Sequence, residues 1–179
     1  RSPQPDFRVT IADQNPVVAP GAGKRFGIEV ERSDGFDGEV RIDIEGLPPG
    51  FSVTTPIIVE AGQPRAWGVV VAAADAVAPS ADVAKLSTVT AIAKIDGQQV
   101  NKSIGSLGEI KLGERPKILT SLTSDPSTSA TNPYVLEVIP GTTTTAALRI
   151  TRNGHDGPVA FGSEEAIANM PHGVYVDNI

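Results

Sequence analysis

The sequence predicts an all-β protein in which two β-sandwich modules follow one another, the second of them incomplete. Three observations support this fold class. Short segments alternate apolar with polar residues, turn-forming residues separate these segments, and a block of glycines and prolines near the N-terminus returns near the C-terminus. Alternation with a period of two places one face of a strand on a core, and a repeated block indicates a duplicated unit.

Composition excludes several classes of protein. Of the 179 residues, 40% are hydrophobic and 20% are charged, which is too apolar for a disordered chain. No apolar run is long enough to span a bilayer. The net charge is -6 and the cations are scattered, so nucleic acid is not an expected partner, because binding it requires clustered cations. Cysteine is absent, which excludes disulfides, thiolate zinc sites and cysteine nucleophiles.

The repeated block sets the domain boundaries. Residues 35–40 and 47–53 read GFDGEV and LPPGFSV, and residues 154–159 and 170–176 read GHDGPV and MPHGVYV. The separation is 120 positions for Pro20/Pro140 and Arg32/Arg152, 119 for Gly38/Gly157 and 123 for Pro48/Pro171. Small drifts of this kind are typical of loop insertions between two copies of one scaffold. We therefore expect modules at residues 1–113 and 114–179.

In the first module the alternation predicts nine strands, with turns between them. The hairpin at Asp96-Gly97 is the most strongly marked, because both positions of a type I′ turn accept positive φ. Residues 74–84 are alanine-rich with Pro79, and we expect a loop with one helical turn. The expected strands are residues 7–12, 17–18, 25–31, 40–44, 51–53, 57–59, 66–73, 88–95 and 98–104.

The second module is expected to repeat only part of this pattern. Its predicted strands are residues 118–122, 134–139, 146–151 and 159–161, with a Ser/Thr-rich loop at 123–133 and an inserted segment at 163–169. It has no counterpart of the strand at 66–73 or of the Asp96-Gly97 hairpin. A half-sandwich leaves strand edges unpaired, so we expect the natural protein to continue beyond this end or another chain to supply the missing strands.

Residues 32–53 and 152–176 resemble bacterial immunoglobulin-like modules that occur in tandem in large exported proteins, beside pre-peptidase-type domains or appended to secreted hydrolases. The resemblance implies immunoglobulin-like sandwiches and an extracytoplasmic location, and it implies no catalytic residues. The expected function is a non-catalytic spacer or interaction module, with flanking domains, proteins or polysaccharides at the cell surface as partners. The alternative is an ancillary carbohydrate-binding module attached to a secreted hydrolase.

Few residues are candidates for chemistry. The only histidines are His155 and His172, and the first copy has nonpolar Phe36 and Pro49 at their positions. Nucleophilic catalysis needs a nucleophile, a base and a group that orients the base, and the sequence shows no such set. We therefore read both histidines as turn residues and expect no enzyme.

Two kinds of ligand site remain as alternatives. Asp34, Asp37 and Asp156 are candidate calcium ligands, but calcium takes 6–8 oxygens, and we favour turns closed by their own side chains. Trp67 is the sole tryptophan. It is a candidate sugar-stacking platform, although we favour a core position on one face with Val69 and Val71.

The matched arginines Arg32 and Arg152 precede the glycine turn in each copy. Two roles are open to them: binding an anion, or tying a loop carbonyl or aspartate to the strand end. Because the arginine recurs in both copies, we favour the structural role.

Overall fold

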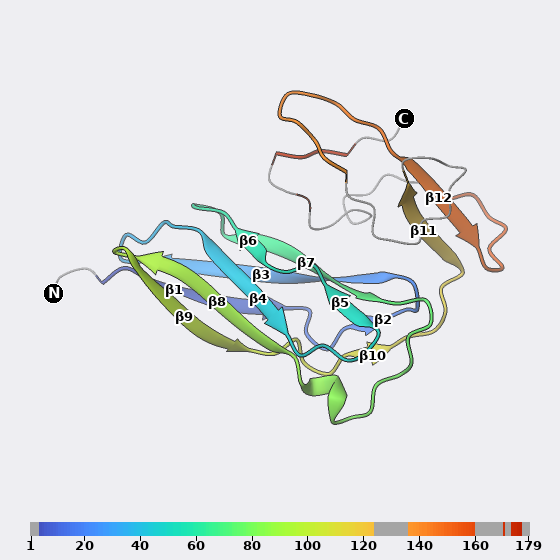
Figure 1. Cartoon of the computed structure of the whole chain (residues 1–179), viewed down its shortest axis with the longest axis horizontal. Coiled ribbons are helices and arrows are strands. Elements are labelled where there is room, and N and C mark those ends of the chain that lie inside the picture. The colour runs from blue at the N-terminus through green and yellow to red at the C-terminus, as the bar shows by residue number, and fades with distance from the viewer. Residues whose placement is uncertain (1–3, 124–135, 160–169, 171–172, 177–179) are drawn as a thin grey trace. The chain divides into compact units, whose positions relative to one another are not determined.

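The computed structural model describes residues 4–123, 136–159, 170 and 173–176. Apart from one 3₁₀ turn, η1 (Val83–Lys85), all regular elements among these residues are β-strands (Figure 1). The all-β prediction is confirmed. The chain divides into two compact units, one containing residues 4–114 together with the described residues beyond 159 and the other containing residues 115–159, and each is described by itself.

The first unit contains two four-stranded antiparallel sheets. One has the order β1-β3-β7-β5 and is made of β1 (Asp6–Ala12), β3 (Gly23–Ser33), β7 (Arg65–Ala72) and β5 (Phe51–Val53). The other has the order β6-β4-β8-β9 and is made of β6 (Ile57–Val59), β4 (Val40–Glu45), β8 (Thr88–Ile95) and β9 (Gln98–Gly105). A short parallel pair joins β2 (Val17–Val18) to β10 (Lys111–Leu112).

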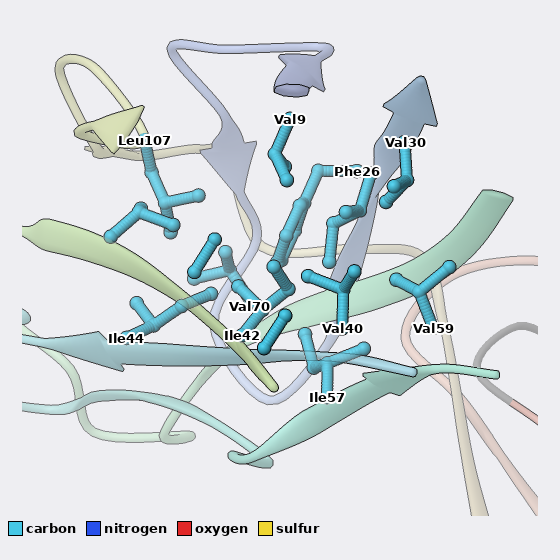
Figure 2. Packing of buried hydrophobic residues seen from close by; sticks show 14 of the residues in the cluster. Val9, Phe26, Val30, Val40, Ile42, Ile44, Ile57, Val59, Val70 and Leu107 are labelled. Atoms are coloured by element: carbon cyan, nitrogen blue, oxygen red, sulfur yellow. The ribbon is translucent and has the colours of Figure 1, made fainter. Parts of the chain in front are cut away.

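One hydrophobic core lies between these two sheets (Figure 2). Each sheet contributes alternate residues of its strands, as the period of two requires. From the first sheet, β3 contributes Phe26 and Ile28, which are 1% and 0% exposed, and from the second sheet β4 contributes Val40 and Ile42, both 0% exposed. The unit is therefore a β-sandwich, and all nine strands predicted for it are present with small shifts at their ends.

Two predicted turns have the expected geometry. Asp96 and Gly97 have φ of +48° and +80° and join β8 to β9 with Ile95 opposite Gln98, as a type I′ hairpin requires. At the proline corner, Phe51 N–H donates to the Pro48 carbonyl at 3.0 Å, and Gly50 has φ of +82°. A glycine is needed there because an L side chain is strained at that angle.

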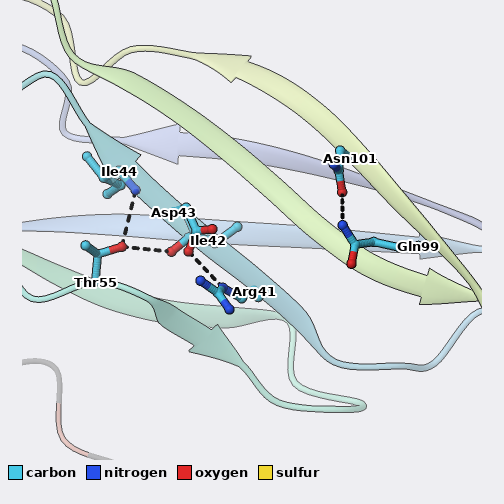
Figure 3. Close-up of polar contacts among 7 residues, drawn as sticks. All are labelled: Arg41, Ile42, Asp43, Ile44, Thr55, Gln99 and Asn101. Atoms are coloured by element: carbon cyan, nitrogen blue, oxygen red, sulfur yellow. Dashed lines mark hydrogen bonds and ion pairs between the residues drawn. The ribbon is translucent and has the colours of Figure 1, made fainter.

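The outward face of the second sheet carries local polar contacts (Figure 3). Arg41 and Asp43 form an ion pair at 2.8 Å on β4. Beside the same strand, Thr55 Oγ1 accepts the Ile44 N–H at 3.2 Å and donates to the Ile42 carbonyl at 3.4 Å. Thr55 thus continues the hydrogen bonding along the edge of β4 where β6 does not extend.

The second unit contains an antiparallel pair, β11 (Ile118–Thr123) and β12 (Ala147–Arg152), with Ile118 opposite Arg152. The strands predicted at 118–122 and 146–151 are confirmed. The strand predicted at 134–139 is wrong for its described part, because residues 136–139 form no strand. Within the part of the second unit that the structure describes, no strand pairs with these residues. The insertion at 163–169, and most of the strand predicted at 159–161, lie outside the described residues.

Candidate functional site

The clearest built feature of the first unit is the loop that Arg32 holds at the end of β3. The Arg32 guanidinium donates from Nε and Nη2 to the Gly38 carbonyl, both at 3.1 Å. Its Nη2 also donates to the Glu60 carbonyl at 2.9 Å, and its Nη1 donates to the Gln63 carbonyl. One partly buried side chain therefore ties the β3–β4 loop and the β6–β7 turn to a strand end. The guanidinium donates to backbone carbonyls at each of these contacts, as expected for an arginine with a structural role.

A similar arrangement occurs in the second unit. Arg152 Nη1 donates to the Gly157 carbonyl at 2.7 Å and to the His155 carbonyl at 3.1 Å. The glycine inside the loop has φ of +84° at Gly154 and +88° at Gly35. In both units an arginine at the strand end therefore holds the carbonyl of a later glycine.

The ring in each loop also lies against that glycine. An ideal Cβ at Gly38 would lie 2.8 Å from the Phe36 ring, and one at Gly157 would lie 3.1 Å from His155 Nε2. Phe36 is buried against Phe7, with ring centroids 5.5 Å apart. A side chain at Gly38 would displace the buried Phe36 ring, whereas one at Gly157 would require only a small shift of the His155 ring.

Two further pairs of matched turns share backbone geometry. Gly21 and Gly141 have φ of +73° and +80°. Beside them, the Ala22 N–H donates to the Ala19 carbonyl at 3.0 Å, and the Thr142 N–H donates to the Ile139 carbonyl at 3.0 Å. Gly50 and Gly173 both have φ of +82°.

Of the two histidines, the structure describes His155, which is held in its loop by its backbone carbonyl. The His155 carbonyl accepts from Arg152, while its imidazole Nε2 is buried and has no hydrogen-bond partner among the described residues. A general base must lie within hydrogen-bond distance of the proton that it removes, and His155 Nε2 has no such partner among the described residues. His172 lies outside the described residues.

Two of the candidate calcium ligands, Asp34 and Asp37, bind backbone N–H groups from distant parts of the first unit, and within the described residues neither is seen to close its own turn with its side chain. Asp34 has φ of +51°, and its carboxylate accepts the Gln4 N–H at 3.4 Å. The Asp37 carbonyl accepts the Gly62 N–H at 3.2 Å. Asp156 is exposed in the second unit. Across residues 4–123, 136–159 and the few described beyond them, no group of three or more His, Cys, Asp or Glu side chains is placed to hold a metal.

The core position favoured for Trp67 is wrong. The buried positions of β7 are Gly68, Val70 and Ala72, and Trp67 lies half-buried on the outward face. The alternation was hidden because both faces of this strand are apolar. At Gly68 an ideal Cβ would lie 2.2 Å from the Phe26 ring, so Phe26 fills the inward space at that position.

The Trp67 ring lies over Gly27, the residue opposite it on β3. The guanidinium carbons of Arg25 and Arg65 lie 4.2 and 5.5 Å from the ring centroid. Arg65 also pairs with Glu29 at 2.5 Å. Arg25 and Glu29 flank Gly27 on β3, so the two arginines approach the ring from opposite directions along the strand. Stacking of this kind stabilises an exposed sheet face by cation–π attraction.

Sequence reasoning missed the contact that joins the edge strands β1 and β9 of the two sheets. Lys102 Nζ donates to Asp6 Oδ1 at 2.5 Å and to the Phe7 carbonyl at 2.6 Å, and it lies 4.5 Å from the Phe7 ring centroid. The hydrogen bond from Lys102 lowers the pKa of Asp6 from its ordinary value of 3.8. The sequence did contain a signal for this contact. Lys102 lies between Val100 and Ile104 on the partly buried face of β9, where a lysine needs a partner.

A scan against protein-family models, a search of curated proteins and a search of solved structures each found no match to this chain. Among the described residues, no helix has the length and apolar character needed to cross a membrane.

Proposed function

We propose that the chain is a non-catalytic spacer or interaction module of a larger secreted or cell-surface bacterial protein. In this proposal, residues 1–113 and 114–179 are immunoglobulin-like modules in tandem, the second represented in part. The observation that carries the proposal is the arginine-held glycine loop, which occurs once in each unit with a guanidinium hydrogen bond to a glycine carbonyl, from Arg32 to Gly38 and from Arg152 to Gly157.

Strand order supports the immunoglobulin-like part of the proposal. Immunoglobulin sandwiches place strands A, B, E and D in one sheet and C, F and G in the other. The order β1-β3-β7-β5 reads A-B-E-D, and β4-β8-β9 reads C-F-G. The remaining strand β6 pairs with β4 at the edge of the second sheet.

The matched turns support the tandem part. Gly21 and Gly141, and then Gly50 and Gly173, occur in the same order in the two halves of the chain with closely similar φ. A turn at positive φ favours glycine over residues that carry a side chain. Retention of these two turns and of the arginine loop is more readily explained by duplication than by independent origin.

A spacer role follows from how the distinctive side chains are used. Arg32, Arg152 and Lys102 all donate to backbone carbonyls, and the Trp67 ring makes cation–π contacts with Arg25 and Arg65. These contacts strengthen turns, edges and a sheet face. Sandwiches in series can hold neighbouring domains apart, and their loops can acquire binding.

Single-molecule stretching of the full chain between two handles tests the spacer role. The first unit, from β1 at Asp6 to β10 at Leu112, should resist and then unfold in one event. The unfolded segment should extend to about 360 Å at roughly 3.4 Å per residue, so the length released is this value less the end-to-end distance of the folded unit. Gradual lengthening at low force, without a discrete event, would contradict a spacer built on this sandwich.

The second candidate function is carbohydrate binding, and the outward position of Trp67 favours it. The test is retention on a glycan array. Retention that is lost in Trp67→Ala and kept in Val69→Ala, a change on the same face of β7, would support a carbohydrate-binding module. Absence of retention on the array leaves the spacer.

A further inference from the structure

The two units carry different residues directly after the matched arginine, Asn153 after Arg152 and Ser33 after Arg32. Asn153 is followed by Gly154, and the sequence contains no other Asn-Gly pair. The backbone nitrogen of the residue after an asparagine can attack the side-chain amide carbon. Glycine permits this approach because it has no Cβ to obstruct it. The first unit has Ser33 after Arg32, and a serine cannot react in this way.

The reaction is balanced without any added reagent other than water. The Gly154 nitrogen loses its proton and forms a bond to Asn153 Cγ, and the Cγ–Nδ2 bond breaks with release of ammonia. The resulting five-membered succinimide is then opened by water at one of its two carbonyls. Opening at one carbonyl gives aspartate, and opening at the other gives isoaspartate.

The local structure leaves room for this ring. Asn153 and Gly154 are both exposed, and an ideal Cβ on Gly154 would meet no atom within 4 Å. Two hydrogen bonds hold Asn153 in place: its N–H donates to the Lys117 carbonyl at 2.7 Å, and its Nδ2 donates to the Pro116 carbonyl at 3.1 Å. Both lie at the end of the β11–β12 pair, where opening costs little free energy.

We propose that Asn153 is a site of spontaneous deamidation and that its product loosens this end of the β11–β12 pair. Deamidation replaces the Nδ2 donor with a carboxylate oxygen that faces the Pro116 carbonyl, so a hydrogen bond becomes a repulsion. It also places a negative charge next to Arg152, where it competes with the Gly157 carbonyl for the guanidinium. In the first unit, Ser33 Oγ donates to the Asp6 carbonyl at 3.3 Å, and that contact is chemically inert.

The first test is peptide mapping, with detection of isoaspartate, of the full chain incubated at neutral pH. The same chain unfolded in urea is the reference. Asn153 should convert in the native chain within about tenfold of its rate in urea, because the end of a two-stranded sheet frays readily. Asn101, which lies within β9, should remain intact in the native chain. Protection of Asn153 by more than about a hundredfold would overturn the proposal, because the site would then be closed in the native fold.

The second test separates loosening from modification. Hydrogen exchange at the Asn153 amide and along β11 is compared in the freshly prepared chain, in Asn153→Asp and in Asn153→Ser. We expect faster exchange in Asn153→Asp and unchanged exchange in Asn153→Ser, which restores the residue of the first unit. Equal exchange in Asn153→Asp and the fresh chain would show that the product does not loosen the pair.

Discussion

Replacement of Arg32 by methionine should strongly destabilise the first unit. The change keeps most of the aliphatic stem and removes the guanidinium that donates to the carbonyls of Gly38, Glu60 and Gln63. Hydrogen bonds from charged donors contribute about 1.5–3 kcal/mol each, and a carbonyl left unpaired costs about 1–3 kcal/mol. Water can reach part of this loop, so we expect a loss of about 2–4 kcal/mol in the free energy of unfolding.

Urea denaturation followed by tryptophan fluorescence measures this loss. Trp67 is the sole tryptophan and lies in the first unit, so its fluorescence reports that unit. Arg152→Met is the matched control, because it removes the corresponding arginine from the other unit and should leave the Trp67 transition in place. Arg32→Lys should recover only part of the loss, since an ammonium lacks the planar fork. A change below about 0.5 kcal/mol in Arg32→Met, the range of ordinary surface substitutions, would refute the structural role assigned to Arg32.

Three further changes test other contacts. Lys102 lowers the pKa of Asp6 below 3.8, so the stabilisation should be present above pH 3.8 and be lost as the pH falls through the folded-state pKa. The stability difference between the natural chain and Asp6→Asn should therefore shrink on acidification, and a pH-independent difference in urea midpoints would contradict this. Gly68→Ala should cost about 1–3 kcal/mol by overpacking against Phe26, as measured by urea denaturation, and a neutral result would mean that the core has room. Trp67→Ala should lower the thermal unfolding midpoint by uncovering Gly27, as followed by far-ultraviolet circular dichroism, and an unchanged midpoint would mean that the ring contributes no stability there.

The longer strands of the first unit were predictable because they turn one face to the core, whereas the two-residue strand β10 was not predicted. In β4 the buried positions Val40, Ile42 and Ile44 alternate with polar ones. A period of two puts all apolar side chains on one face of a strand, whereas a helix would scatter them around its axis. The Asp96-Gly97 hairpin was predictable for a local reason, since its geometry depends on the φ values of two adjacent residues.

Other features depend on contacts that no local pattern records. The sequence did not show which face of β7 is buried, because Trp67 and Val69 on the outward face are apolar as well. On the inward face Gly68 has no side chain, and the Phe26 ring from β3 occupies the space beside it. The junction of Lys102 with Asp6 joins residues distant in the chain. Alternation at residues 134–139 predicted a strand, and its described part, residues 136–139, forms none, because a strand also needs a partner to accept and donate its hydrogen bonds.

The parallel pair of β2 and β10 affects the order in which the first unit can fold. Lys111 lies opposite Val17, so two short segments from opposite ends of the unit must meet before the sandwich is complete. Contacts between residues so far apart are slow to form because a long loop must close first. If the chain emerges from a ribosome or an export channel N-terminus first, the sheets can begin to assemble during emergence. The β2–β10 pair, however, can form only after Leu112 has emerged. A chain stalled before that point would expose the edge that β10 later covers, and it would be open to proteases and to pairing with other nascent chains.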